Sequence, residues 1–262
     1  NERERRRPVG PAEASREVNP TREASSPVAE LRVEQNIEGA WRTAADAVTR
    51  AIAAGVSAAG RATIAVSGGE TPRGLHRLLA QPPWVEAIPW ERLHIFWADE
   101  RMVPYDDPAS NYGAACVDWL GRLPCAAAGI HPVPVDRPPE VAAHRYAEEL
   151  RSHFQRNEHP EPVLDLLVLG VGPDGHTASL FPGDPVLDEQ RRWTAAVKGG
   201  NPDLWRVTLT YPVLNRARRV LFLAAGDNKA EVVHRVLTEA PPVLPAGRVR
   251  PAAGAVTWVL DR

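Results

Sequence analysis

The sequence lacks several features that would assign it to a specialised class of protein. Only two of its 262 residues are cysteines, Cys116 and Cys125, and no Cys or His cluster of metal-ligand spacing surrounds them. Neither a disulfide framework nor a metal site is therefore indicated. No apolar run reaches the roughly 18 residues of a membrane span, and the net charge of -2 provides no basic field for nucleic acid. We expect a small-molecule partner in a reducing cytoplasm, with no nucleic acid and no membrane.

Lysine is scarce as well, because Lys198 and Lys229 are the only two among 31 Lys plus Arg residues. Codon bias accounts for the imbalance but not for the two positions. Lys198 lies in "VKGGNP" and reads as an ordinary loop lysine. Lys229, in "GDNKAEVV", falls in the first turn of an expected helix, where a cation opposes the helix dipole. Binding of an anion at that helix end explains its position better than local stability does.

Residues 1–28 differ in composition from the rest of the chain. They are rich in Arg, Glu, Pro and Ser and have almost no large apolar side chains. Such a segment buries too little apolar surface to offset the entropy of ordering. A disordered tail is predicted there, followed by a single α/β domain over residues 29–262. The "RERRR" cluster in the tail is interpreted as a solvated charge run rather than a nucleic-acid contact.

Beyond the tail, short apolar runs alternate with helical patterns. The runs predict strands buried on both faces, at residues 62–66, 93–98, 164–170, 205–210, 219–225 and 255–260. The patterns predict helices at residues 36–55, 72–80, 111–123, 140–154 and 228–240. This alternation predicts a doubly wound α/β fold, with a mainly parallel sheet and helices on both faces. Ligands of such sheets bind beyond the carboxyl ends of the strands.

The first of these strand ends is followed by "SGGETP". Ser67, Gly68 and Gly69 form the expected turn, with Thr71 as the N-cap and Pro72 as the first helical residue. A glycine turn before a helix presents free N–H groups and the positive end of the dipole, which suits a phosphate. Glycines required only by the turn geometry are an equally good explanation. The spacing matches neither a nucleotide P-loop nor a dinucleotide fingerprint.

Three charged residues, Asp99, Glu100 and Arg101, end the second strand. One interpretation is an ion-paired strand end, because unpaired ions in a core cost several kcal/mol. The other is that Arg101 reaches an anionic oxygen of a ligand while the two acids orient it. Ser110 is expected to cap the next helix. Arg206 opens another strand run, where it reaches the same anion as Lys229 or lies exposed.

The third strand end carries "GVGPDGHTASLFPG", with Asp174 and His176 two positions apart. Its glycines permit positive φ angles and close approach of the backbone. A histidine in such a turn is a better catalytic candidate than one on a helix face, since imidazole exchanges protons near neutral pH. Asp174 either fixes the tautomer of His176 or caps a helix that "HTASLF" begins. The remaining histidines are assigned to packing or to solvent.

Five segments between residues 67 and 229, "SGGETP", "DERMVP", "GVGPDGHTASLFPG", "RVTLT" and "GDNK", occur in a recognisable order. Together they resemble the 6-phosphogluconolactonase family, hydrolases of the pentose phosphate pathway within the glucosamine-6-phosphate deaminase/isomerase superfamily. The resemblance covers essentially all of the chain after the tail and implies the same doubly wound α/β fold. Glu70 is one departure, because the family loop usually has Ser there. An acid beside a phosphate site is unfavourable unless its side chain turns away.

The resemblance implies hydrolysis of a sugar-phosphate lactone without a cofactor, a metal or a covalent nucleophile. By the family pattern, His176 is the general base for water, Asp174 orients it, and Arg101 lies near the lactone. The substrate-binding residues, which include those that hold its phosphate, are then Ser67, Gly68, Gly69, Thr71, Asp99, Arg206 and Lys229. The enzyme is expected to be a monomer or a small homo-oligomer.

Two alternatives differ from this interpretation in testable ways. A deaminase/isomerase of the same superfamily also uses an Asp-Gly-His turn, but usually has different residues after the His and a "DEY"-like segment in place of "DER". The segments "HTASLFP" and "DER" in this chain favour the lactonase. A non-catalytic sugar-phosphate sensor would keep the phosphate loop and lose the acid/base residues. The presence of Asp174, His176 and Arg101 together argues against the sensor.

Overall fold

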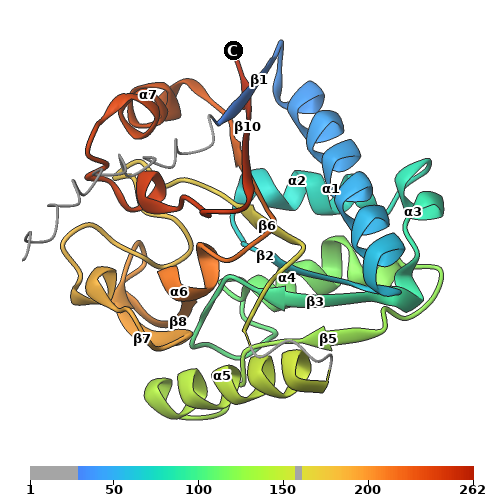
Figure 1. Cartoon of the computed structure of the whole chain (residues 1–262), viewed down its shortest axis with the longest axis horizontal. Helices are drawn as coiled ribbons and strands as arrows, with labels where there is room; N and C mark the ends of the chain where they lie inside the picture. The colour runs from blue at the N-terminus through green and yellow to red at the C-terminus, as the bar shows by residue number, and fades with distance from the viewer. Residues whose placement is uncertain (1–28, 157–160) are drawn as a thin grey trace, which may run out of the picture.

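A seven-stranded parallel sheet forms the centre of the computed structural model, which describes residues 29–156 and 161–262 (Figure 1). Its strand order is β1-β10-β9-β6-β2-β3-β5, and neighbouring strands pair in parallel. The strands are β1 (Glu30–Glu34), β2 (Ala62–Val66), β3 (Leu93–Trp97), β5 (Gly129–His131), β6 (Leu166–Leu169), β9 (Arg219–Ala224) and β10 (Ala255–Asp261). The predicted fold class is confirmed. The predicted tail, residues 1–28, lies outside the described residues.

A second sheet of three antiparallel strands corrects one prediction. It contains β4 (Asp99–Arg101), β8 (Leu204–Leu209) and β7 (Thr194–Gly199), in that order. The run at residues 205–210 was expected in the parallel sheet, but its strand β8 pairs with β4 and β7. An apolar run shows that a strand is buried, whereas its partners depend on where the chain turns. Here β4 follows β3 after one residue, and β8 pairs with β4 in the second sheet.

Helices cover both faces of the parallel sheet, as predicted. Helices α1 (Ile37–Ala59), α2 (Glu70–Leu79) and α4 (Asn111–Asp118) pack with short α3 (Trp84–Ala87) on one face, whose core includes Ile64, Val66 and Trp97. Helices α5 (Pro139–Arg156), α6 (Tyr211–Leu214) and α7 (Ala230–Thr238) contribute to the other core, which includes Ala65 and Phe96. Alternate residues of one strand therefore point to opposite cores. Figure 1 shows α1 and α5 on opposite sides of the sheet.

Helix α1 extends beyond the predicted glycine stop. Its N-cap is Asn36, whose Oδ1 accepts the N–H of Gly39 at 2.9 Å. The predicted end at Gly55 is wrong, since the helix continues and ends at Gly60, which has a φ of 74°. Gly55 serves packing instead, because a Cβ there would lie 2.9 Å from the Asp165 carboxyl carbon. No helix of the described residues is long and apolar enough to cross a membrane.

Candidate active site

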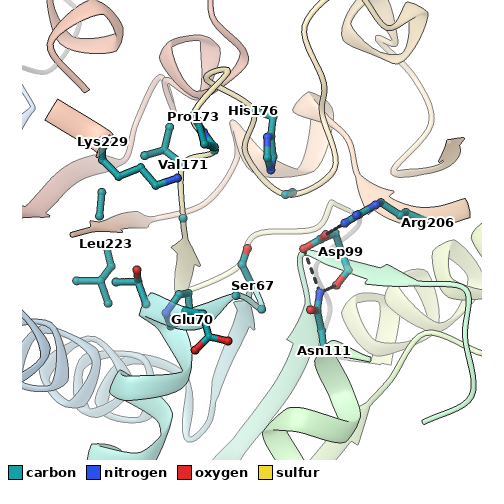
Figure 2. A pocket seen from close by; sticks show the side chains of 18 of the residues that line it. Ser67, Glu70, Asp99, Asn111, Val171, Pro173, His176, Arg206, Leu223 and Lys229 are labelled. Carbon is teal, nitrogen blue, oxygen red and sulfur yellow. Dashed lines mark hydrogen bonds and ion pairs between the residues drawn. The ribbon is translucent and has the colours of Figure 1, made fainter. Parts of the chain in front are cut away.

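The carboxyl ends of β2, β3, β6 and β9 open onto a cavity of about 270 Å³ (Figure 2). Its polar lining comes from segments far apart in the sequence and consists of Ser67, Gly68, Gly69, Glu70, Thr71, Asp99, Arg101, Asn111, His176, Arg206 and Lys229. Every predicted site residue except Asp174 therefore lies on its wall. Asp174 is instead hydrogen-bonded to His176. The predicted strand ends do converge on one rim of the sheet.

His176 and Asp174 form a hydrogen-bonded pair at this rim. His176 Nδ1 lies 2.6 Å from Asp174 Oδ1, and the same oxygen accepts the His176 backbone N–H at 3.1 Å. Burial alone would raise the pKa of Asp174, but these two hydrogen bonds and the nearby imidazole together hold that pKa below its usual value. An ionised Asp174 leaves the proton on Nδ1 of the ring, so Nε2 is the nitrogen able to accept one. The imidazole is 29% exposed and points into the cavity (Figure 2).

The turn that holds His176 uses its glycines as predicted. Gly175 has a φ of 85°, in the left-handed region that favours glycine. A Cβ on Gly172 would lie 2.0 Å from His176 Nδ1, so the ring packs directly against bare backbone. The alternative role of Asp174 as a helix cap is wrong, because residues 176–181 contain no helix and Thr177 instead forms an isolated antiparallel bridge with Leu180.

The loop after β2 presents uncapped backbone and one buried hydroxyl to the cavity. Helix α2 begins at Glu70 with Gly69 as its N-cap, so the prediction that Thr71 caps it is wrong. Gly69 has no side chain to bond the first-turn N–H groups, which remain available to a ligand. Ser67 Oγ is buried and has no hydrogen-bond partner among the described residues. The Glu70 side chain is 91% exposed, so solvent screens its charge.

The charged residues Asp99 and Arg101 of strand β4 have different partners. Asp99 Oδ2 accepts the Ser179 hydroxyl at 2.7 Å and lies 4.0 Å from Arg206 Nη1. The Arg101 guanidinium donates to the carbonyl of Ala109 at 2.7 Å, while its Nε is buried without a hydrogen-bond partner in the described chain. The interpretation of an ion-paired strand end, in which the two acids hold Arg101, is therefore wrong.

Two cations besides Arg101 reach the cavity wall. Arg206 is 4% exposed, its Nε donates to the carbonyl of Gly199 at 2.9 Å, and burial is the main cause of its lowered pKa. It is not an exposed strand-end arginine. Lys229 ends the 3₁₀ turn Asp227–Lys229 just before α7, rather than lying in the first turn of that helix. Burial lowers its pKa, which the Asp174 carboxylate partly offsets. Figure 2 shows its side chain extended toward Val171.

Comparisons with known proteins agree with this arrangement. Residues 35–258 match the family model described as glucosamine-6-phosphate isomerases/6-phosphogluconolactonase. A 6-phosphogluconolactonase of Synechocystis is 41% identical over 218 residues, which are 82% of this chain and 88% of that protein. The rat 6-phosphogluconolactonase is 42% identical over 204 residues, 77% and 79% of the two chains. A solved 6-phosphogluconolactonase from Trypanosoma cruzi superposes with a TM-score of 0.79 at 28% identity, over 90% and 96% of the chains.

The chain belongs to the glucosamine-6-phosphate isomerase/6-phosphogluconolactonase family. The resemblance inferred from the five segments is thereby confirmed. Asn111 is a polar side chain of the cavity lining that was not predicted as a site residue from the sequence. Asn111 is buried, and its Nδ2 donates to the Asp99 carbonyl at 2.8 Å (Figure 2). Gly68 makes room for it, because a Cβ there would lie 1.8 Å from Asn111 Oδ1. In the sequence, the feature that could have identified Asn111 was its position next to the capping residue Ser110.

Glu100 organises the entry to α4 in this family member. Its carboxylate accepts the backbone N–H groups of Arg101, Asn111 and Tyr112, each at 2.7 Å, and the Ser110 hydroxyl at 3.1 Å. Burial is the main cause that raises the pKa of Glu100, and the backbone hydrogen bonds oppose it. Ser110 also caps α4, as predicted, by accepting the Gly113 N–H at 3.0 Å. Glu100 thus holds the end of β4 and the start of α4 together, and both contribute residues to the cavity wall.

Replacing Glu100 with alanine should lower the free energy of unfolding by about 2–5 kcal/mol, because each buried donor left unpaired costs about 1–3 kcal/mol. Urea unfolding of the two proteins measures the difference. The exposed Glu86 provides the control, since a Glu86→Ala change on the surface should stay within about 0.5 kcal/mol. Equal stability of Glu100→Ala and the parent would contradict the assigned role.

Proposed function

We propose that this protein hydrolyses 6-phospho-D-glucono-1,5-lactone to 6-phosphogluconate, in the oxidative branch of the pentose phosphate pathway. Relatives about 40% identical over most of both chains bear the name 6-phosphogluconolactonase. The observation that carries the proposal is the His176–Asp174 pair on the same cavity as three cationic side chains and an uncapped helix start. A lactone with a remote phosphate requires a base, a stabiliser of developing negative charge, and a phosphate site.

In the proposed reaction, His176 acts as the general base. Its Nε2 takes a proton from water as the water oxygen attacks the lactone carbonyl carbon. The carbonyl oxygen becomes an oxyanion, which Arg101 stabilises from the cavity wall. When the oxyanion collapses, the bond to the ring oxygen breaks, and that oxygen takes the proton back from the imidazolium. The products are a carboxylic acid, ionised at neutral pH, and the freed hydroxyl.

Asp174 supports this cycle by holding the imidazole and stabilising its protonated form. The hydrogen bond of 2.6 Å to Nδ1 orients the ring, and the lowered pKa of Asp174 keeps a negative charge beside it. When Nε2 gains a proton, this charge stabilises the imidazolium, as in other base–carboxylate pairs. The steps require neither a covalent intermediate nor a cofactor.

The phosphate is assigned to Lys229, Arg206 and the loop at residues 67–71. Lys229 contributes a partly desolvated ammonium, and the loop contributes the Ser67 hydroxyl and the first-turn N–H groups of α2. Asp99 supports Arg206 from 4.0 Å. Binding energy from the remote phosphate then serves to place the lactone carbonyl beside the base.

The assay that tests this function compares two substrates of the family. Continuous titration measures the acid that is released from the lactone. We expect this release to be far faster than spontaneous hydrolysis of the lactone. Ammonia release from glucosamine 6-phosphate should stay at background, since "DER" and "HTASLFP" favour the lactonase. Ammonia release without lactone hydrolysis would assign the protein to the isomerase branch. Binding of 6-phosphogluconate with neither activity would indicate a sensor.

The proposed setting is the cytoplasm, with a small-molecule lactone as the partner and a monomer or small homo-oligomer as the working form. Cys116 and Cys125 are both free thiols, which agrees with a reducing compartment.

A further inference from the structure

Three histidine side chains meet between the edge of the parallel sheet and helix α5. His94 comes from β3, His131 from the edge strand β5 and His153 from α5. One ring nitrogen of each lies within 4.8 Å of the other two. None of the three lines the active-site cavity. Figure 1 shows α5 lying alongside β5, the edge strand of the sheet. Wide spacing in the sequence hides it from any local metal-binding pattern.

The contacts within the cluster leave two ring nitrogens facing each other. His94 Nδ1 lies 3.1 Å from His131 Nε2. On the far side of its ring, His131 Nδ1 lies 2.7 Å from Glu149 Oε1. His153 Nε2 lies 2.9 Å from the Thr63 hydroxyl, which ties this ring to β2. The carboxylate on Nδ1 favours the tautomer of His131 that is protonated on Nδ1, so Nε2 is the acceptor toward His94 Nδ1.

A glycine permits this approach. Gly129 pairs in register with His94, and a Cβ on it would lie 2.4 Å from His94 Nδ1 and 2.5 Å from His131 Nε2. No other residue type would leave both nitrogens in place. The bare backbone at position 129 is thus a condition of the cluster.

Histidine is also a suitable ligand type for this kind of site. A neutral imidazole nitrogen binds Zn²⁺ and other borderline transition metals. Among the described contacts of the cluster, the charged side chain is Glu149, which bonds His131.

We propose that His94, His131 and His153 form a binding site for a divalent transition metal of the Zn²⁺ type, separate from the active site. An ion 2.0–2.1 Å from each nitrogen in tetrahedral geometry holds the nitrogens roughly 3.3 Å apart. The pair His94–His131 is already at 3.1 Å, and His153 completes the set by turning its ring and giving up its contact with the Thr63 hydroxyl. His94 moves its proton from Nδ1 to Nε2 as the metal binds, and water fills the fourth position. The bound metal links α5 to β3 and β5.

Calorimetric titration of the full chain, first stripped of metal, with Zn²⁺ tests the site. We expect one equivalent to bind and the melting temperature to rise with it. His131→Ala should lose that equivalent and the rise in melting temperature. Glu149→Gln, at a side chain that is 51% exposed, should keep the equivalent with an affinity about 10- to 100-fold weaker. Gly129→Ala should abolish binding although all three histidines remain.

Two controls separate this site from other histidines. His144→Ala removes an exposed imidazole of the same helix and should bind Zn²⁺ as the parent does. His176→Ala removes the active-site imidazole and should also keep the equivalent. Lactone hydrolysis by the His131, Glu149 and Gly129 variants verifies that each is folded. The proposal is overturned if folded His131→Ala still binds its equivalent, if the parent binds none, or if His176→Ala loses it.

Discussion

Replacing His176 with alanine is expected to lower kcat for lactone hydrolysis by about 10²- to 10⁴-fold, the usual contribution of general-base assistance. The fold should persist, because the imidazole is 29% exposed and its side-chain hydrogen bond is to Asp174 of the same turn. Binding of the substrate phosphate should be little affected, so KM should change much less than kcat. Steady-state kinetics with the melting temperature as a parallel measurement verifies both statements.

A matched control is the exposed His144, which forms an ion pair with Glu148 on α5 and whose alanine variant should keep full turnover. Asp174→Asn gives a second readout, since it retains the side-chain shape but removes the charge that stabilises the imidazolium. It should reduce kcat less than, or as much as, His176→Ala, and the double variant should lose little more. Full turnover of a folded His176→Ala would show that the ring only packs in its turn.

Replacing Lys229 with alanine should chiefly raise KM, by about 10- to 100-fold. Hydrogen bonds to charged groups contribute about 1.5–3 kcal/mol, and each 1.4 kcal/mol corresponds to about a factor of ten. The ammonium lies on the cavity wall and is partly desolvated, so solvent screens its attraction for a phosphate less than at the surface. Initial rates over a range of lactone concentrations, corrected for spontaneous hydrolysis, separate KM from kcat.

The chain supplies its own control in Lys198, the other lysine. Its ammonium lies 3.5 Å from Asp203 and its side chain is 54% exposed, so Lys198→Ala should leave KM unchanged. With a lactone that lacks the phosphate, the difference should disappear, so that the parent and Lys229→Ala have similar KM values. An unchanged KM for the phosphorylated lactone in Lys229→Ala would remove this residue from the phosphate site.

The elements that the sequence predicted well are those whose burial is continuous. Strand β2 has the predicted limits of residues 62–66 and is buried at every position, which produces an uninterrupted apolar run. The missed strands lack that signal. Strand β1 is mostly exposed, β7 is buried over only part of its length, β5 has three residues at the sheet edge, and β4 reads "DER". Pairing with a neighbour, rather than composition, makes these segments strands.

The candidate site divides in the same way. Glycine turns and isolated polar residues after apolar runs marked Ser67, His176 and Lys229, because strand ends in a parallel sheet share one rim. Side-chain partners were not predictable. Arg101 pairs with the Ala109 carbonyl, and Glu100 accepts backbone N–H groups around α4 rather than orienting that arginine. These contacts depend on the path of the chain after β4, which places residues 109–112 beside that strand.

The sequence by itself determined the fold class, the family and the residues offered at the strand ends, since all three depend on local pattern and order along the chain. Only the tertiary structure decided which of those residues line the same cavity and which side chains form hydrogen bonds or ion pairs with them. It also brought His94, His131 and His153 together. The physical reason is that strand order and helix packing place remote residues side by side, and these are set by the whole core rather than by any one segment.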